Sequence, residues 1–207
     1  MTYRITEVFD SIQGEGAQAG QRMVFVRFAG CNLWNGREDG RAKGAGNCAA
    51  WCDTDFLPRR TMTADELLSE MNSLWPAGGE RWCCMTGGEP LLQLDQQLCS
   101  RLMVDGWRIA LETNGTIDHG LWIDHVTVSP KKGGELKLGS ADSLKVVLPG
   151  GWSANEVAAL AERYRYATSY VQMQYGEPSA LEQCLSVIRG DSRWKLSVQI
   201  HKTLGMR

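Results

Sequence analysis

The sequence predicts an α/β fold, an open partial (β/α) barrel of about six or seven parallel strands in a single domain spanning residues 1–207. Strand-like and helix-like segments alternate along the chain with short connections, which is typical of a parallel sheet covered by helices. The chain has 207 residues, fewer than the roughly 250 that a closed (β/α)₈ barrel takes. It contains no internal repeat, low-complexity segment or linker that would mark a second domain.

The strands are predicted from short runs of β-branched, aromatic and other apolar residues. In chain order they cover residues 5–12, 23–30, 81–85, 107–113, 125–130, 143–149, 167–174 and 194–200. The first of these is a strand or hairpin arm, because its alternation is mixed. Small or polar residues follow five of the strands, in FAGC, TGGEP, ETNG, TVSPK and VQMQ. Ligand sites in such folds collect at the carboxyl ends of strands, so we expect one shared cavity there.

Four helices are predicted between the strands. Two begin at capping boxes, Thr63 to Glu66 and Ser153 to Glu156, in which a hydroxyl and a carboxylate satisfy the first free amides. These two helices cover residues 64–74 and 154–163. The other two cover residues 91–106 and 178–190, and both end at a glycine.

Composition excludes several classes of protein. Hydrophobic residues make up 43% of the chain, charged residues 22%, and the formal net charge is -2, which gives no reason to expect nucleic-acid or membrane-surface binding. The N-terminal stretch MTYRITEVFDSIQGEG lacks the apolar run of a signal peptide, and no segment is long and apolar enough to span a membrane. We therefore expect a cytoplasmic protein whose seven cysteines serve metal or redox roles rather than disulfides.

Three cysteines, Cys31, Cys48 and Cys52, lie in the loop over residues 31–56, whose polar, glycine-rich stretch is not expected to form a core. The remaining four cysteines lie on predicted strands or helices, where burial is the usual role. A zinc site normally has four protein ligands, and no histidine stands at short spacing to this loop. Three thiols suit an iron–sulfur cluster with one iron left open for a small molecule. Unrelated cysteines in a floppy loop are the alternative.

These residues resemble a known family. GCNLW, CAAWCDTDF and TGGEP resemble the radical S-adenosylmethionine (SAM) enzymes. FDSIQGEG, VRFAGCNLW, WCDTDF, LETNGT, VSPK and the terminal QIHKTLG are similar, more narrowly, to the 7-carboxy-7-deazaguanine synthases, and the match spans nearly the whole chain. The resemblance implies a radical SAM type of partial barrel, and a lyase that makes a 7-deazapurine precursor for queuosine in modified tRNA.

The cysteine spacing departs from the superfamily pattern of C-x3-C-x2-C. Sixteen residues separate Cys31 from Cys48, and three separate Cys48 from Cys52, so the pattern places the middle ligand where Ala49 stands. Because the loop offers no other thiol, the resemblance implies Cys31, Cys48 and Cys52 as ligands of a [4Fe–4S] cluster. The open iron would hold the amino and carboxylate groups of SAM.

The resemblance also implies which residues bind SAM and substrate. The SAM set is Trp51, Cys52, Asp53, Gly87, Gly88, Glu89, Ser129, Pro130, Lys131, Gln172, Met173, Gln174 and Tyr175. The family usually has a proline where Met173 stands. The substrate, 6-carboxy-5,6,7,8-tetrahydropterin, would contact Ile12, Gln13, Gly14, Glu15, Arg27, Thr86, Glu112, Asn114, His201 and Arg207. Arg27 suits the carboxylate, unless an edge strand leaves it in solvent. The segment over residues 199–207 would close the pocket, and Thr54 would bind Mg²⁺.

The implied partners are a reductant such as flavodoxin or ferredoxin and a second copy of the chain, because an open barrel often buries its exposed edge. An activase that makes a glycyl radical on a partner protein would share the cluster and GGEP, but it has no reason to carry IQGEG. A zinc-stabilised binding module is the non-enzymatic alternative; it would be colourless and would not bind SAM.

Overall fold

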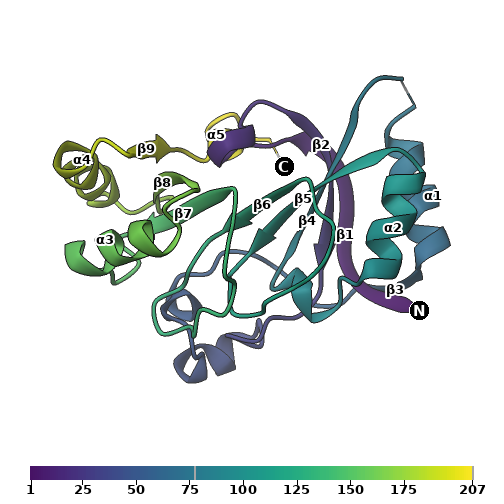
Figure 1. Ribbon diagram of the computed structural model, residues 1–207. Coiled ribbons are helices and arrows are strands. Elements are labelled where there is room, and N and C mark those ends of the chain that lie inside the picture. Colours follow the sequence, from purple (N-terminus) through teal and green to yellow (C-terminus); the bar gives the residue numbers. More distant parts are fainter. Residues whose placement is uncertain (77, 207) are drawn as a thin grey trace.

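The computed structural model describes residues 1–76 and 78–206, and in them nine strands form one open sheet flanked by helices (Figure 1). The strand order is β3-β1-β2-β4-β5-β6-β7-β8-β9. The strands are β1 (Thr2–Ile12), β2 (Arg22–Phe28), β3 (Arg60–Thr63), β4 (Arg81–Gly87), β5 (Trp107–Thr113), β6 (His125–Val128), β7 (Ser143–Leu148), β8 (Thr168–Met173) and β9 (Trp194–Ser197).

Strands β2 and β4 to β9 run parallel, which confirms the predicted open parallel sheet. The other two strands are antiparallel additions: β1 pairs with β2 and β3. Strand β3 was not predicted, because its four residues, RTMT, carry too short a pattern to register as a strand.

The helices are α1 (Ala64–Leu74), α2 (Gln96–Val104), α3 (Ala154–Arg163), α4 (Ala180–Gly190) and the short α5 (Ile200–Thr203). Both predicted capping boxes form, at the starts of α1 and α3. The helix predicted from residue 91 was placed too early: residues 90–92 form a separate 3₁₀ turn, and the Asp95 side chain caps α2. The strand predicted to run to residue 200 ends at Ser197, and Ile200 begins α5.

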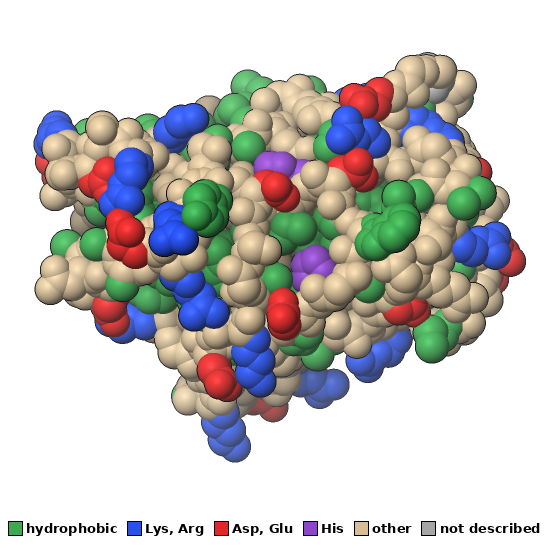
Figure 2. Space-filling view, viewed as in Figure 1, with side chains coloured by type: hydrophobic (Ala, Val, Ile, Leu, Met, Phe, Trp, Pro, Cys, Tyr) green, Lys and Arg blue, Asp and Glu red, His purple; other side chains and the backbone are tan. Residues whose placement is uncertain are grey.

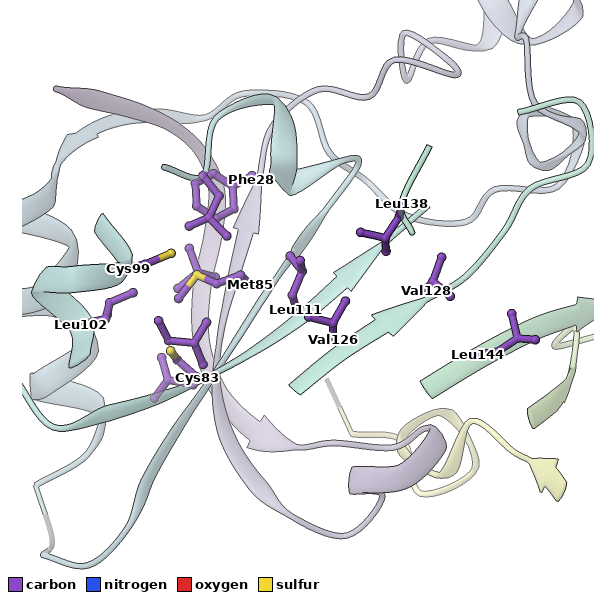
Figure 3. Packing of buried hydrophobic residues seen from close by; sticks show 14 of the residues in the cluster. Phe28, Cys83, Met85, Cys99, Leu102, Leu111, Val126, Val128, Leu138 and Leu144 are labelled. Carbon is purple, nitrogen blue, oxygen red and sulfur yellow. The ribbon is translucent and has the colours of Figure 1, made fainter. Parts of the chain in front are cut away.

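Alternation along the parallel strands separates a helix-covered face from a concave face. Residues such as Phe28, Met85 and Leu111 point toward the helices and belong to the main hydrophobic core, together with Cys99 and Leu102 of α2 (Figure 3). Their neighbours along the same strands point to the opposite face, where only a small apolar cluster forms, around Met23, Trp82, Cys84 and Ala110. The rest of that face is available for a site.

The surface shown in Figure 2 carries Lys and Arg side chains interspersed with Asp and Glu, not a single basic field. This mixture is consistent with the formal net charge of -2. Among residues 1–76 and 78–206, no helix has the length and apolar character needed to cross a membrane.

Candidate active site

The concave face of the sheet bears polar side chains that strand alternation brings together. Arg27 on β2 lies opposite Thr86 on β4, and Glu112, Lys145 and Gln172 follow on β5, β7 and β8. All five line one cavity of about 450 Å³. This volume lies within the usual range of small-molecule sites, about 300–1,000 Å³. The expectation of one cavity shared by several strand ends is therefore confirmed.

The loop over residues 31–56 covers one side of this cavity and is more ordered than its composition suggests. Trp34, Ala49 and Phe56 pack into a small core of their own, so the expectation that the stretch forms no core was wrong. The Arg41 guanidinium lies 4.3 Å from the centroid of the Trp34 ring and donates to the backbone oxygens of Ala49 and Cys52. These bonds add to those that the loop backbone makes with itself, such as the bond from the Ala45 amide to the Leu33 carbonyl.

The loop directs three thiols into the cavity. Cys31, Cys48 and Cys52 all line it. Cys48 lies in the 3₁₀ turn Asn47–Ala50, and its carbonyl accepts a 2.6 Å hydrogen bond from the Cys52 amide, so the two thiols stand one turn apart. Ala49, the position that the superfamily spacing favours, is buried in the loop's core, where a Cβ on Gly44 would collide with it. The longer spacing therefore turns Cys48, not residue 49, toward the cavity.

The three thiols suit a cluster better than a single ion. Among the residues that the structure describes, no three His, Cys, Asp or Glu side chains converge on one point as they would around zinc. Each thiolate on a cubane binds a different iron, so its thiols surround a larger volume. Burial raises the pKa of Cys31 and raises that of Cys48 to about 11, while nearby Lys131 acts in the opposite direction on Cys48. Iron would have to displace these protons on binding.

The two glycines of TGGEP lie where the backbone packs too closely on neighbouring segments to leave room for a side chain. A Cβ on Gly87 would collide with the carbonyl oxygen of Phe28, and one on Gly88 would collide with that of Gly30 and lie 2.9 Å from the Cβ of Cys31. The glycine pair thus lets β4 end directly beside the start of the cysteine loop. Both glycines also line the cavity.

Glu89, which the resemblance places in the SAM-binding set, bonds to other parts of the chain. Its fully buried carboxylate accepts hydrogen bonds from the Thr113 hydroxyl at 2.8 Å, the Asn114 amide at 2.8 Å and the Leu91 amide at 3.1 Å. Burial raises the pKa of Glu89 above its usual value, and these hydrogen bonds offset only part of that rise. The side chain ties the end of β4 to the end of β5 and does not line the cavity.

The residues after β6 and the tryptophan of the cysteine loop meet across the cavity. The Lys131 ammonium donates to the Ser129 hydroxyl at 2.7 Å and lies 5.9 Å from the centroid of the Trp51 ring. The Trp51 indole N–H is buried and has no partner among the described residues. A cationic group, a hydroxyl and a free indole donor thus lie next to the thiols.

Three residues of the segment over residues 199–207, which is expected to close the pocket, line the cavity: Gln199, His201 and Lys202. The Ile200 amide donates to the Gly14 carbonyl at 3.1 Å, and the ion pair between Lys202 and Asp53 joins α5 to the cysteine loop. His201 is half-buried and packs so closely on Gly14 that a Cβ there would collide with Nδ1. Figure 1 shows the yellow chain end beside the purple segment that follows β1.

A buried charge network lies beneath this closure. The Lys145 ammonium donates to Glu15 Oε2 at 2.5 Å and to Glu112 Oε2 at 2.9 Å, and Gln199 Nε2 donates to Glu15 Oε1 at 2.7 Å. Burial raises the pKa of Glu15, but Lys145 and the amide donors outweigh it and lower the pKa to about 2. The two carboxylates raise the pKa of Lys145 despite its burial. Glu15 and Lys145 are therefore both charged at neutral pH.

Most of the predicted site residues lie around the same cavity. Its lining contains Ile12, Gln13, Gly14, Glu15, Arg27, Cys31, Cys48, Trp51, Cys52, Asp53, Thr54, Thr86, Gly87, Gly88, Glu112, Asn114, Ser129, Lys131, Gln172 and His201. Arg27 is not on an edge strand in solvent: β2 is flanked by β1 and β4, and Glu7 accepts from Arg27 Nε at 2.7 Å. Absent from the lining are Glu89, Pro130, Met173, Gln174 and Tyr175. Arg207 lies outside the described residues.

Sequence reasoning missed some lining residues, namely Glu7, Phe9, Phe25, Cys84, Lys145 and Val147 among others, and it named Gln199 and Lys202 only as part of the closing segment. Lys145 had a usable signal, because a lysine within the apolar run SLKVVL is as anomalous as Arg27 within VFVRF. Cys84 had none, because a cysteine on an apolar strand is most often part of a core.

The chain is similar to known proteins both in sequence and in fold. No family model matches it. The chain is 40% identical over 215 residues to the 7-carboxy-7-deazaguanine synthase of Burkholderia multivorans, and 40% identical over 217 residues to that of Bradyrhizobium diazoefficiens; each alignment covers all of both chains. Its fold matches the crystal structure of QueE from Escherichia coli with a TM-score of 0.71, at 23% identity and with 96% and 94% of the two chains covered. The chain belongs to the 7-carboxy-7-deazaguanine synthase family.

Proposed function

We propose that this chain is a radical SAM lyase that converts 6-carboxy-5,6,7,8-tetrahydropterin to 7-carboxy-7-deazaguanine with loss of ammonia, in the biosynthesis of queuosine. The observation that carries the proposal is the convergence of three thiols, Arg27 and the buried carboxylates on one cavity, in a chain whose relatives bear this name over their full length. The cavity brings together residues that lie far apart in the chain, such as Arg27, Glu112 and Lys145.

The residues around the thiols suit the cofactors of this reaction. Cys31, Cys48 and Cys52 would hold a [4Fe–4S] cluster, and Ser129, Lys131 and Trp51 would hold SAM through their polar groups and the aromatic ring. When bound, these cofactors would supply the chemistry of the reaction, namely the hydrogen abstraction by a 5′-deoxyadenosyl radical at C6 of the substrate that ring contraction requires. Gly87 and Gly88 keep the end of β4 close enough to the loop for both cofactors to share one cavity.

The far side of the cavity suits the pterin. Arg27, oriented by Glu7, would pair with the substrate carboxylate, because a guanidinium offers parallel donors to two oxygens. Glu15, Glu112 and Gln13 would accept from the N–H groups of the pterin ring. The closing segment, through Gln199 and His201, would exclude water from the substrate while the radical is present. These residues bind, orient and shield, and the bond-breaking chemistry belongs to the cofactors.

We further infer that Thr54, which lines the cavity, is a ligand of Mg²⁺. A single hydroxyl is a weak site by itself, so the substrate carboxylate and water molecules would supply the remaining oxygens of an octahedron. Mg²⁺ binding should therefore depend on substrate. We also infer a flavodoxin or ferredoxin as reductant, and a homodimer formed at an exposed sheet edge: β9 is one such edge, and Leu196 is 40% exposed there.

Anaerobic reconstitution tests the function. The protein, loaded with iron and sulfide, is incubated with SAM, dithionite, Mg²⁺ and the carboxypterin, and 7-carboxy-7-deazaguanine is sought by mass spectrometry. Cys31→Ala should abolish product, whereas Cys99→Ala, on α2 and away from the cavity, should retain the cluster and the reaction. A protein that takes up the cluster, binds SAM and still forms no product would contradict the proposal.

A further inference from the structure

Lys145 lines the cavity and is almost fully buried. An unpaired ammonium group in such a place would destabilise the fold. The Lys145 side chain is 6% exposed, and its Nζ contacts Glu15, from the loop after β1, and Glu112, from β5. Removing one member of a buried ion pair leaves an uncompensated charge. The three side chains come from segments up to 130 residues apart, so only the folded sheet brings them together.

The network carries two negative charges and one positive charge. Each oxygen of Glu15 already accepts one hydrogen bond, Oε2 from Lys145 and Oε1 from Gln199, and retains a second lone pair. Glu112 accepts from Lys145 through Oε2, and no described residue donates to its Oε1. Glu112 lines the cavity and is 19% exposed, so Lys145 holds this carboxylate in place while one oxygen keeps its capacity to accept from a ligand.

Other charged and titratable groups face the network from every neighbouring element. They are Arg27 on β2, Cys84 on β4, Lys131 after β6 and His201 on α5. Among the residues that the structure describes, only Lys145 donates hydrogen bonds to both carboxylates. Without it, two carboxylates would share a buried site, where mutual repulsion makes one of them hold a proton at neutral pH.

We propose that Lys145 is a positioning residue for the pterin: its hydrogen bonds hold the carboxylates of Glu15 and Glu112 in place, so that the cavity offers carboxylate oxygens to the N–H edge of the ring. The inference rests on the proposed function. Lys145 acts through the two carboxylates and not on the reacting atoms. It follows that its loss weakens binding of the pterin and leaves the cluster and SAM, on the other side of the cavity, undisturbed.

The test compares Lys145→Met and Lys145→Arg with Lys195→Met, a control that removes an exposed lysine of β9. Lys145→Met should raise the KM for the carboxypterin roughly tenfold to a hundredfold, the effect of one lost charge-assisted hydrogen bond. The KM for SAM and the iron content should not change, and Lys145→Arg should recover most of the loss. The pterin KM of Lys145→Met should fall as pH rises, as the repelling carboxylates lose their shared proton, while that of the wild type stays flat near neutrality.

A second comparison applies if Lys145→Met fails to fold. In a Glu15→Gln background, adding Lys145→Met leaves Glu112 as the single charge of the network, with nothing to repel it. The double variant should bind the pterin more weakly than Glu15→Gln alone. An equal KM in that pair, or a wild-type KM in folded Lys145→Met, overturns the inference while the proposed function stands. A wild-type protein that neither binds nor converts the pterin overturns both.

Discussion

Replacing Gly14 with alanine should detach the closing segment, because the backbone at this position touches α5 directly. A Cβ on Gly14 would collide with the His201 ring and lie 2.9 Å from the backbone nitrogen of His201. The ring can rotate away, but the backbone nitrogen moves only with the whole segment. That movement stretches the bond from the Ile200 amide to the Gly14 carbonyl, 3.1 Å, and the bond from Gln199 to Glu15, 2.7 Å.

The magnitude follows from those two bonds. A neutral hydrogen bond contributes about 1 kcal/mol and one to a charged group about 1.5–3 kcal/mol, so losing both costs roughly 2.5–4 kcal/mol of docking free energy. This corresponds to a segment that opens roughly a hundredfold to a thousandfold more often. The pterin KM should rise with it, because Gln199 and His201 line the cavity.

Hydrogen–deuterium exchange of the amides over residues 199–204 measures the opening directly and requires neither cluster nor substrate. The matched control is Gly139→Ala, at a glycine where a Cβ meets no atom within 4 Å. Unchanged protection of residues 199–204 in Gly14→Ala, with the rest of the protein equally folded, would refute the reasoning that Gly14 is the docking point.

Three further predictions concern the cluster, the buried network and the fold. After reconstitution, Cys48→Ala should contain little iron and sulfide and should lack the brown charge-transfer absorbance of a cluster. The control Cys99→Ala should keep all three. A full cluster in the Cys48 variant would show that the middle ligand is misassigned. Because the folded pKa of Glu15 lies near 2, below its usual value near 4.5, its ionisation stabilises the fold above about pH 4.5, and this contribution is lost as the pH falls toward 2. Denaturant unfolding should show Glu15→Gln less stable than the wild type at pH 6, with the difference shrinking toward pH 3; a constant difference would contradict the assignment. Thr63→Ala, which removes the N-cap of α1, should lower the free energy of unfolding by about 1 kcal/mol. The control Thr61→Ala, at an exposed residue of β3, should lower it by less.

The order of strands and helices could be predicted because each depends on local patterns. Residues 64–74 carry a capping box and helical periodicity, and residues 107–113 carry a buried strand pattern; both elements form with those bounds. Local patterns failed at short or irregular segments. The pattern of β3 is only four residues long, and the chain after Ser197 turns into α5 because Gly14 and Glu15 hold it there.

For the site, too, the features that depend on residue type could be predicted, and those that depend on tertiary contacts could not. By itself the sequence determined which chemistry is present: three loop thiols, glycines at the end of β4, and an arginine within an apolar strand. Only the tertiary structure decided that Cys48 and not residue 49 faces the cavity, that Glu89 ties two strands together, and that Lys145 joins Glu15 to Glu112. The physical reason is that residue type is a local property, whereas the partner of a buried charge or thiol is set by register between strands far apart in the chain.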